Sequence, residues 1–159
     1  MHLLENYTLI SAGNRDSKII KEVIYSILNE YGLKEDEDNT DADLNNIQKH
    51  YTNNDGFFGK ILQNNKIVGT IGLFKLDDVT CELRKMYLLK EHRGKGLGKL
   101  LMDIIIKKAK EKKYKKIELE TASVLQEAIG LYKKYGFREI EKSNLANRCD
   151  KAFILELSQ

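Results

Sequence analysis

The stretch Cys81-Glu-Leu-Arg-Lys-Met-Tyr-Leu-Leu-Lys-Glu-His-Arg-Gly-Lys-Gly-Leu-Gly-Lys-Leu-Leu101 decides the fold of this chain. Its first half is typical of a buried strand, its middle is a short basic turn rich in glycine, and its end opens an amphipathic helix. The start of a helix presents free N–H groups and a partial positive charge, so it attracts anions. The sequence therefore predicts a phosphate-binding turn between a strand and a helix.

The composition of this turn favours a diphosphate as the bound anion. Alternating glycines let the backbone approach the anion with no Cβ in the way; they are Gly94, Gly96 and Gly98. Cations beside them add formal charge; they are Arg93, Lys95 and Lys99.

The spacing of these residues differs from two common nucleotide-binding motifs. A P-loop has four residues between its first glycine and its Gly-Lys pair, which Ser or Thr then follows. Here only three residues separate Gly94 from Gly98, and Leu100 follows Lys99. The dinucleotide-binding fingerprint has two residues between its second and third glycines, whereas the glycines here alternate.

The pattern Arg93-x-x-Gly96-x-Gly98, between a strand and a helix, resembles the acyl-CoA-binding segment of the GNAT family of N-acetyltransferases, Gln/Arg-x-x-Gly-x-Gly/Ala. Ala128-x-x-x-Tyr132-x-x-x-Gly136-Phe137 resembles a second segment of that family. The resemblance extends over roughly residues 56–137. It implies an α/β (α+β) acyl-CoA N-acyltransferase fold, with a mixed, mostly antiparallel sheet of six or seven strands flanked by about four helices, and acetyl-CoA as the acyl donor.

The resemblance also implies roles for single residues. A tyrosine at the place of Tyr132 directs its hydroxyl toward the CoA sulfur in that family, so Tyr132 is the candidate general acid. Glu82 lies eleven residues before Arg93, the spacing of the general base in GNAT histone acetyltransferases, so Glu82 is the candidate base. The pantetheine is expected on the backbone of Met86, Tyr87 and Leu88. The diphosphate is expected on Arg93, Gly94, Lys95, Gly96, Leu97, Gly98 and Lys99.

The chemistry requires groups of these kinds. An amine is an ammonium ion near pH 7 and cannot attack a thioester until it loses a proton, which a buried carboxylate can accept directly or through water. A backbone N–H near Met86 or Leu88 would stabilise the oxyanion, a contribution of ~3 kcal/mol per donor. Direct transfer of this kind needs neither a metal nor a covalent intermediate. The alternatives are purely structural roles, in which Glu82 only pairs with Arg84 or a lysine and Tyr132 only packs in the core.

Two positions depart from the family pattern. The family usually has Asn three residues before the alanine of its second segment, where it contacts the pantetheine, and this chain has Leu125 there. The family often has proline at the position of Lys90, which concerns the shape of the loop.

The rest of the chain shows alternating strand and helix patterns. Apolar residues recur at helical spacing over about 17–31, 42–51, 96–113 and 123–135. Period-two patterns bounded by polar turns predict strands over 7–10, 56–63, 66–76, 79–89, 117–120, 137–141 and 152–157. The strand over 117–120 follows a crossover helix and is expected to run parallel to its predecessor. Thr121 or Ser123 is expected to cap the last helix, and Gly136 to end it.

Length and composition limit the class of protein. The chain of 159 residues predicts one domain over residues 1–159. A net charge of +3 is too small to imply a nucleic-acid partner. Cys81 and Cys149 have no metal-binding spacing, so no metal is expected and both are expected as reduced thiols. We see no signal-peptide pattern and no apolar run near the ~20 residues that cross a bilayer, so the protein is expected in the cytoplasm.

The acceptor is less defined. Acceptor pockets are built from loops, here over about 32–43 and 142–151. The acidic run over 35–43 is either a solvated loop or a rim that attracts a cationic amine. It favours a small-molecule amine, a polyamine or a protein or peptide amine. Pairing through the last strands would give a homodimer.

Two readings from other classes stay open on the sequence alone. A non-catalytic acyl-CoA-binding or regulatory module would keep the diphosphate turn and leave Glu82 and Tyr132 idle. A nucleic-acid-binding protein would use the lysine cluster at the end of the third helix, which comprises Lys107, Lys108, Lys110, Lys112, Lys113, Lys115 and Lys116.

Overall fold

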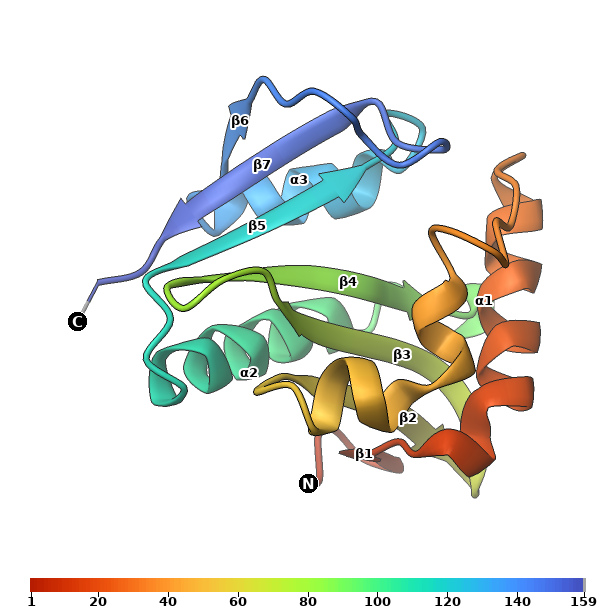
Figure 1. Ribbon diagram of the computed structural model, residues 1–159. Helices are drawn as coiled ribbons and strands as arrows, with labels where there is room; N and C mark the ends of the chain where they lie inside the picture. The colour runs from red at the N-terminus through yellow and green to blue at the C-terminus, as the bar shows by residue number, and fades with distance from the viewer. Residues whose placement is uncertain (159) are drawn as a thin grey trace.

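A computed structural model describes residues 1–158, and its centre is one mixed sheet with the strand order β1-β2-β3-β4-β5-β7-β6 (Figure 1). All neighbouring strands are antiparallel except β4 and β5, which are parallel. The predicted sheet and its one parallel pair are confirmed. The strands are β1 (Tyr7–Ser11), β2 (Phe57–Gln63), β3 (Lys66–Lys75), β4 (Thr80–Leu88), β5 (Lys116–Thr121), β6 (Arg138–Ile140) and β7 (Lys151–Glu156).

Helices cover both faces of the sheet. On one face α2 (Leu97–Glu111) and α3 (Gln126–Lys134) pack against the larger core, which includes Leu83, Ile117 and Phe153. On the other face α1 (Ser17–Glu30) and the segment after it pack against β2 and β3, around Tyr51 and Phe58. The cleft described below lies between these two layers, beside β4.

The apolar spacing of α1 and α2 explains their placement. The buried residues of α1 recur three and four positions apart, and so do those of α2, so each helix has one apolar face. Burying one such side chain contributes about 1.5–3 kcal/mol. They are Ile20, Val23, Ile24, Ile27 and Leu28 in α1, and Leu97, Leu101, Met102, Ile105 and Ala109 in α2.

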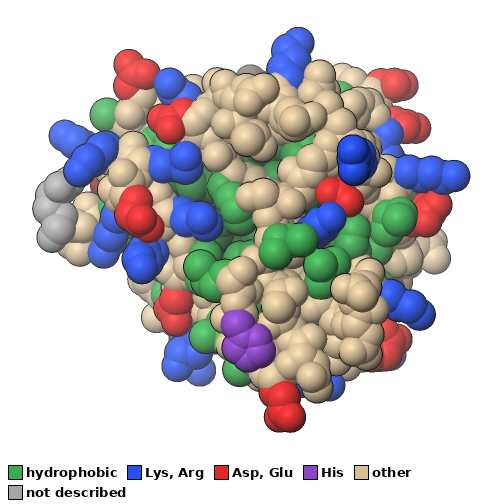
Figure 2. All heavy atoms as spheres, turned by 90° about the horizontal axis from the view of Figure 1, so that it is seen from below, with side chains coloured by type: hydrophobic (Ala, Val, Ile, Leu, Met, Phe, Trp, Pro, Cys, Tyr) green, Lys and Arg blue, Asp and Glu red, His purple; other side chains and the backbone are tan. Residues whose placement is uncertain are grey.

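Basic side chains gather at the end of α2. Figure 2 shows Lys and Arg side chains along the edge of the molecule where this helix ends. Lys108 and Lys110 lie in its last turn, where cations interact favourably with the helix dipole.

The strands predicted over 56–63, 66–76 and 79–89 are confirmed, and they form an antiparallel meander of β2, β3 and β4. Asn64 and Asn65 both have positive φ, 51° and 63°, which a two-residue hairpin turn of this hand requires. Gly69 in β3 allows close backbone approach, because a Cβ there would lie 2.7 Å from the carbonyl oxygen of Tyr87 in β4.

The sheet opens in the middle of β4. Strands β4 and β5 pair only over Thr80–Glu82 and Lys116–Glu118, and Figure 1 shows them diverging beyond that point. Just past it, Thr70 pairs with Tyr87 and Gly72 pairs with Arg84. Two residues of β4, Lys85 and Met86, therefore face one residue of β3, which is a β-bulge. Lys85 adopts a left-handed backbone conformation there, with φ 53°.

The single helix predicted over 42–51 is wrong. The segment forms a 3-10 turn over Ala42–Asn45 and a separate π-helical turn over Gln48–Thr52. Asn46 breaks the helix between them with φ −151° and ψ 79°, and its side-chain oxygen accepts the N–H of Lys49 at 3.1 Å. An asparagine side chain that bonds nearby backbone competes with helix formation in this way.

The predicted cap of α3 is also wrong. Leu125 occupies the N-cap position without a side-chain hydrogen bond. The hydroxyl of Ser123 instead donates to Asp150 at 2.6 Å, a partner that sequence spacing does not reveal. Gly136 ends the helix with φ 93°, as predicted.

Among the helices of residues 1–158, none combines the length and the apolar character that crossing a bilayer demands.

Candidate active site

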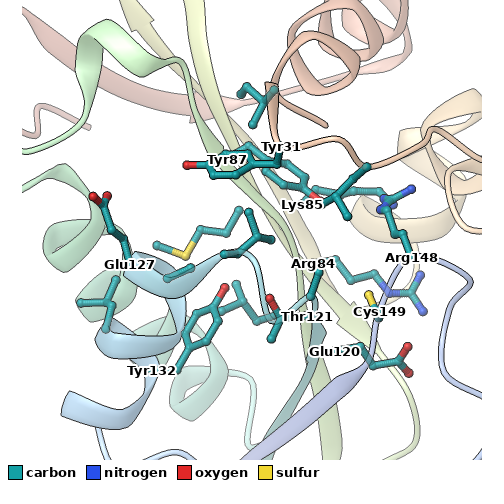
Figure 3. A pocket seen from close by; sticks show the side chains of 18 of the residues that line it. Tyr31, Arg84, Lys85, Tyr87, Glu120, Thr121, Glu127, Tyr132, Arg148 and Cys149 are labelled. Atoms are coloured by element: carbon teal, nitrogen blue, oxygen red, sulfur yellow. The ribbon is translucent and has the colours of Figure 1, made fainter. Parts of the chain in front are cut away.

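A cleft with a volume of ≈ 550 Å³ opens where β4 leaves β5 (Figure 3). Residues 82–88 of β4 form one wall. We call one part of the cleft the helix end, lined by Arg93, Gly94, Leu97, Gly98, Lys99 and Glu127. We call the other part the loop end, lined by Asn39, Thr40, Asn144, Ala146, Arg148 and Cys149. In Figure 3, Glu127 and Arg148 lie at opposite sides of the pocket.

The helix end has the geometry of an anion site. Gly94 and Gly96 have φ values of 73° and 88°, which favour glycine, and α2 begins directly after them at Leu97 without a side-chain cap. Its first N–H groups therefore stay available to an anion. Most of the predicted cofactor residues line the cleft, while Lys95 and Gly96 do not; those that do are Met86, Tyr87, Leu88, Arg93, Gly94, Leu97, Gly98 and Lys99.

Arg93 is held by α1. Its guanidinium donates to both carboxylate oxygens of Glu30, at 2.7 and 2.9 Å, and to the hydroxyl of Tyr31 at 3.0 Å. Its Nε donates to the carbonyl of Leu88 at 2.9 Å. The hydrogen bonds that Arg93 donates to Glu30 raise the pKa of Arg93. Sequence reasoning missed Glu30 and Tyr31, because both lie some sixty residues from the motif.

Glu82 lines the cleft and is also paired with cations. Its side chain is 8% exposed, and it accepts a hydrogen bond from Nε of Arg84. The ammonium of Lys142 lies 3.8 Å from its second oxygen, and 3.6 and 2.8 Å from carboxylate oxygens of Glu118 and Glu120. The expected ion pair with Arg84 is thus present. It leaves Glu82 beside the cleft, where it would have to exchange partners before accepting a proton from a ligand.

Tyr132 lies across the cleft from Tyr87, and its hydroxyl points into the pocket (Figure 3). Its ring packs against Phe137 and Phe153, with centroids 5.8 and 6.3 Å away. Burial raises the pKa of Tyr132 above its ordinary value, so the hydroxyl keeps its proton at neutral pH. The residue is therefore a packed core tyrosine whose protonated hydroxyl faces the cleft. Leu125 lines the same cleft.

The loop end is formed by the two loops that the sequence indicated for the acceptor. Cys149 lines it, and burial raises the pKa of its thiol to about 11. Cys81 is a free thiol that lies in the core, away from the cleft lining, and burial raises its pKa to about 12.

The acidic run is divided into an exposed part and a buried part. Glu35, Glu37 and Asp38 are exposed, but Asp41 and Asp43 are buried. The partners of the two buried carboxylates come from distant parts of the chain: Lys85, Arg84 and Arg148. Sequence reasoning missed them, since no local pattern marks which member of an acidic run is buried.

Comparison with known proteins agrees with this geometry. Residues 21–137 match the model of the acetyltransferase (GNAT) family. The uncharacterized N-acetyltransferase YjgM of Escherichia coli is 36% identical over 132 residues, which cover 80% of this chain and 79% of YjgM. Several other curated N-acetyltransferases are longer, and the chain spans about half of their length.

Solved structures show the same fold. An acetyltransferase of the GNAT family from Staphylococcus aureus Mu50 superposes with a TM-score of 0.89 and 32% identity, over 96% of this chain and 99% of that one. The acetyltransferase yncA of Salmonella typhimurium, solved with its cofactor acetyl-CoA, superposes with a TM-score of 0.75 and 18% identity, over 97% and 95% of the two chains. The chain belongs to the GNAT family of acetyltransferases. Its class of activity is acetyl-CoA-dependent N-acetylation, as the resemblance implied.

Proposed function

We propose that this protein moves the acetyl group of acetyl-CoA directly to a primary amine, with CoA along the helix end and the acceptor at the loop end. One observation carries the proposal. Glu82 and Tyr132, separated by fifty residues, line the same cleft, and the free N-terminus of α2 lies at its helix end. The cleft thus combines an anion site with a carboxylate and a protonated hydroxyl.

Each group has one role in the proposed reaction. Backbone N–H groups at the start of α2 bind the diphosphate, and the backbone of residues 86–88 pairs with the pantetheine and supplies an N–H to the developing oxyanion. Glu82 takes a proton from the acceptor ammonium, directly or through water. The amine nitrogen then bonds to the acetyl carbon while the bond from that carbon to sulfur breaks. Tyr132 gives its proton to the departing thiolate, and the second proton, which the nitrogen loses as the amide forms, returns to the Tyr132 oxygen through solvent.

Charge at the loop end favours a cationic or neutral acceptor. Among the described residues that line this region, each cation already has a carboxylate partner: Arg84 pairs with Glu82, Lys85 with Asp41, and Arg148 with Asp41. A carboxylate on the acceptor would find these cations occupied. We therefore propose a small-molecule amine, a polyamine or a lysine of a peptide as the acceptor, rather than an acidic metabolite.

The test is release of free thiol from acetyl-CoA with a panel of amines that includes polyamines and peptides. Loss of an acid or base group typically lowers turnover by about 10²–10⁴-fold, so we expect falls of this size for Tyr132→Phe and Glu82→Gln, with CoA binding retained.

Tyr25→Phe is the matched control, because the hydroxyl of Tyr25 is buried, has no hydrogen-bond partner among residues 1–158 and lies outside the cleft lining. Turnover of Tyr132→Phe equal to that of Tyr25→Phe would remove the acid role. CoA binding without thiol release for any amine would favour the non-catalytic module.

A further inference from the structure

A buried cluster of opposite charges lies behind the loop end of the cleft. Asp41, fully buried, accepts two hydrogen bonds from the guanidinium of Arg148, both at 2.8 Å, and one from the ammonium of Lys85 at 2.8 Å. The backbone N–H of Asp36 donates to it at 2.9 Å. The side chains of Lys85 and Arg148 are only 4% and 8% exposed. A single carboxylate therefore bridges two buried cations.

These contacts join three segments that are far apart in the sequence. Asp41 belongs to the connection after α1, Lys85 to β4, and Arg148 to the loop before β7. The same three segments line the cleft, through Thr40 and Arg148 at the loop end and through Lys85 in the β4 wall. Asp41 does not line the cleft, so any influence on a bound acceptor passes through its neighbours.

One of these neighbours is the bulge of β4. Lys85 has a left-handed backbone at φ 53°, a conformation that is unfavourable for residues with a Cβ. Its carbonyl accepts a hydrogen bond from the hydroxyl of Thr70 at 2.6 Å, and its ammonium donates to the carbonyl of Thr40 at 2.9 Å as well as to Asp41. The backbone and the side-chain ammonium of Lys85 are thus fixed by separate contacts. The next residues, 86–88, are those expected along the pantetheine.

We propose that Asp41 is a positioning residue for acetyl transfer, which fixes the β4 bulge through Lys85 and the loop before β7 through Arg148. This inference rests on the proposed function. Without the carboxylate, two buried cations lie near one another with a single negative neighbour, Asp43, whose oxygen lies 3.6 Å from Lys85. The bulge and the loop would then move apart or admit water. The helix end, built on backbone groups of residues 94–99, would be unaffected.

The test is steady-state kinetics of Asp41→Asn with the best amine of the panel, beside calorimetric titration with CoA. Misplacement of reacting groups by about 1 Å can cost 10²-fold in rate, so we expect kcat to fall by about 10- to 100-fold and the acceptor KM to rise, with the CoA Kd within about twofold. The stoichiometry of CoA binding counts folded molecules, so a loss of fold cannot imitate a fall in kcat.

Asp38→Asn is the matched control, since Asp38 is an exposed carboxylate of the same acidic run. It should keep wild-type kcat and acceptor KM. If Asp41→Asn does not fold, Arg148→Lys takes its place. Arg148→Lys keeps the charge but loses the paired hydrogen bonds, and a raised acceptor KM is expected. Unchanged kcat and acceptor KM per CoA-binding molecule in the folded variant overturn the proposal.

A wild-type protein that binds CoA but acetylates no amine would refute the proposed function separately. Amide hydrogen exchange then decides the positioning claim. Faster exchange over 84–88 and 142–149 in Asp41→Asn than in Asp38→Asn, with α2 unchanged, supports it. Equal exchange in the two variants overturns it.

Discussion

The two ends of the cleft are built in opposite ways. Apart from Glu127, the helix end is one continuous stretch, residues 93–99, and what it offers a ligand is mainly backbone N–H groups at the start of α2. The loop end is assembled from two loops that are far apart in the sequence, and side-chain ion pairs such as Asp41 with Arg148 hold it together. A backbone site depends on φ angles and on glycine. A site held by side chains depends on charge, so the two ends should fail under different perturbations.

The largest effect, a loss of CoA affinity, is expected from a substitution that distorts the helix end. Gly96 has φ 88°, and a β-branched residue in that conformation costs about 1–2 kcal/mol, so Gly96→Val should reorient the first N–H groups of α2. We expect CoA affinity to fall by about 30-fold or more, which corresponds to ~2 kcal/mol, as measured by calorimetry. Gly130→Ala is the control, because a Cβ at Gly130 meets nothing within 4 Å. Wild-type affinity in Gly96→Val would show that the site lies elsewhere.

Loss of a buried hydrogen bond behind the loop end should instead lower the free energy of unfolding. Tyr51 is buried and its hydroxyl donates to Asp43, whose other oxygen has no hydrogen-bond partner within the described residues. Tyr51→Phe leaves this carboxylate further unsatisfied, at a cost of about 1–3 kcal/mol in the free energy of unfolding by denaturant. Tyr25→Phe removes a hydroxyl without a partner and should cost less. Equal losses in the two variants would contradict the assigned hydrogen bond.

Acid should weaken the loop end more than the helix end. Burial alone would raise the pKa of Asp41, but hydrogen bonds from Arg148 and the charge of Lys85 outweigh it and hold the pKa well below its ordinary value. A group with a lowered folded pKa contributes stability above its unfolded pKa, near 4, and loses it as the pH falls further. The denaturant midpoint should therefore fall below about pH 4. Asp41→Asn should flatten that fall, and an unchanged slope would assign it to other carboxylates.

The smallest effect concerns the contact between α1 and the helix end. Glu30 holds Arg93 with side chains that are 31% and 20% exposed, and pairs of this kind contribute about 0.2–1 kcal/mol. Because Glu30 occupies Arg93 and repels an anion, Glu30→Gln should tighten CoA binding by about two- to fivefold. Glu22→Gln, exposed on the same helix, should not. Weaker binding in Glu30→Gln would mean that the pair orients Arg93 rather than competing for it.

The contrast also explains what the sequence could predict. Gly94, Gly96 and the strand before them act within a few residues, so their pattern predicted the anion site and the order of strand, turn and helix. Apolar periodicity placed α1 and α2 for the same reason. The β-bulge at Lys85 could not be predicted, because a lysine with positive φ carries no signature in the sequence.

Long-range side-chain contacts were equally unpredictable. The pairing of Asp41 with Arg148 joins residues 107 positions apart, and the acidic run gives no sign that Asp41 is the buried member. Asn46 interrupted a predicted helix because its amide bonds the backbone of Lys49, and helical spacing of the apolar residues does not register that competition. Glu82 and Tyr132 were identified as candidates through family resemblance, and the sequence also offered an ion pair with Arg84 and core packing as alternatives. The position of Lys142 beside Glu82, and of Phe137 and Phe153 against Tyr132, required the folded chain.

Lys142 is an internal cation that competes with the proposed acceptor amine for Glu82. Its ammonium lies among Glu82, Glu118 and Glu120, so an acceptor amine that approaches Glu82 meets carboxylates already compensated by an internal cation. Such an encounter is an ion exchange, in which one ammonium displaces another. Added salt screens the attraction of these carboxylates for Lys142 as well as their attraction for the acceptor amine. Acceptor affinity should therefore vary less with ionic strength than it would at an uncompensated carboxylate.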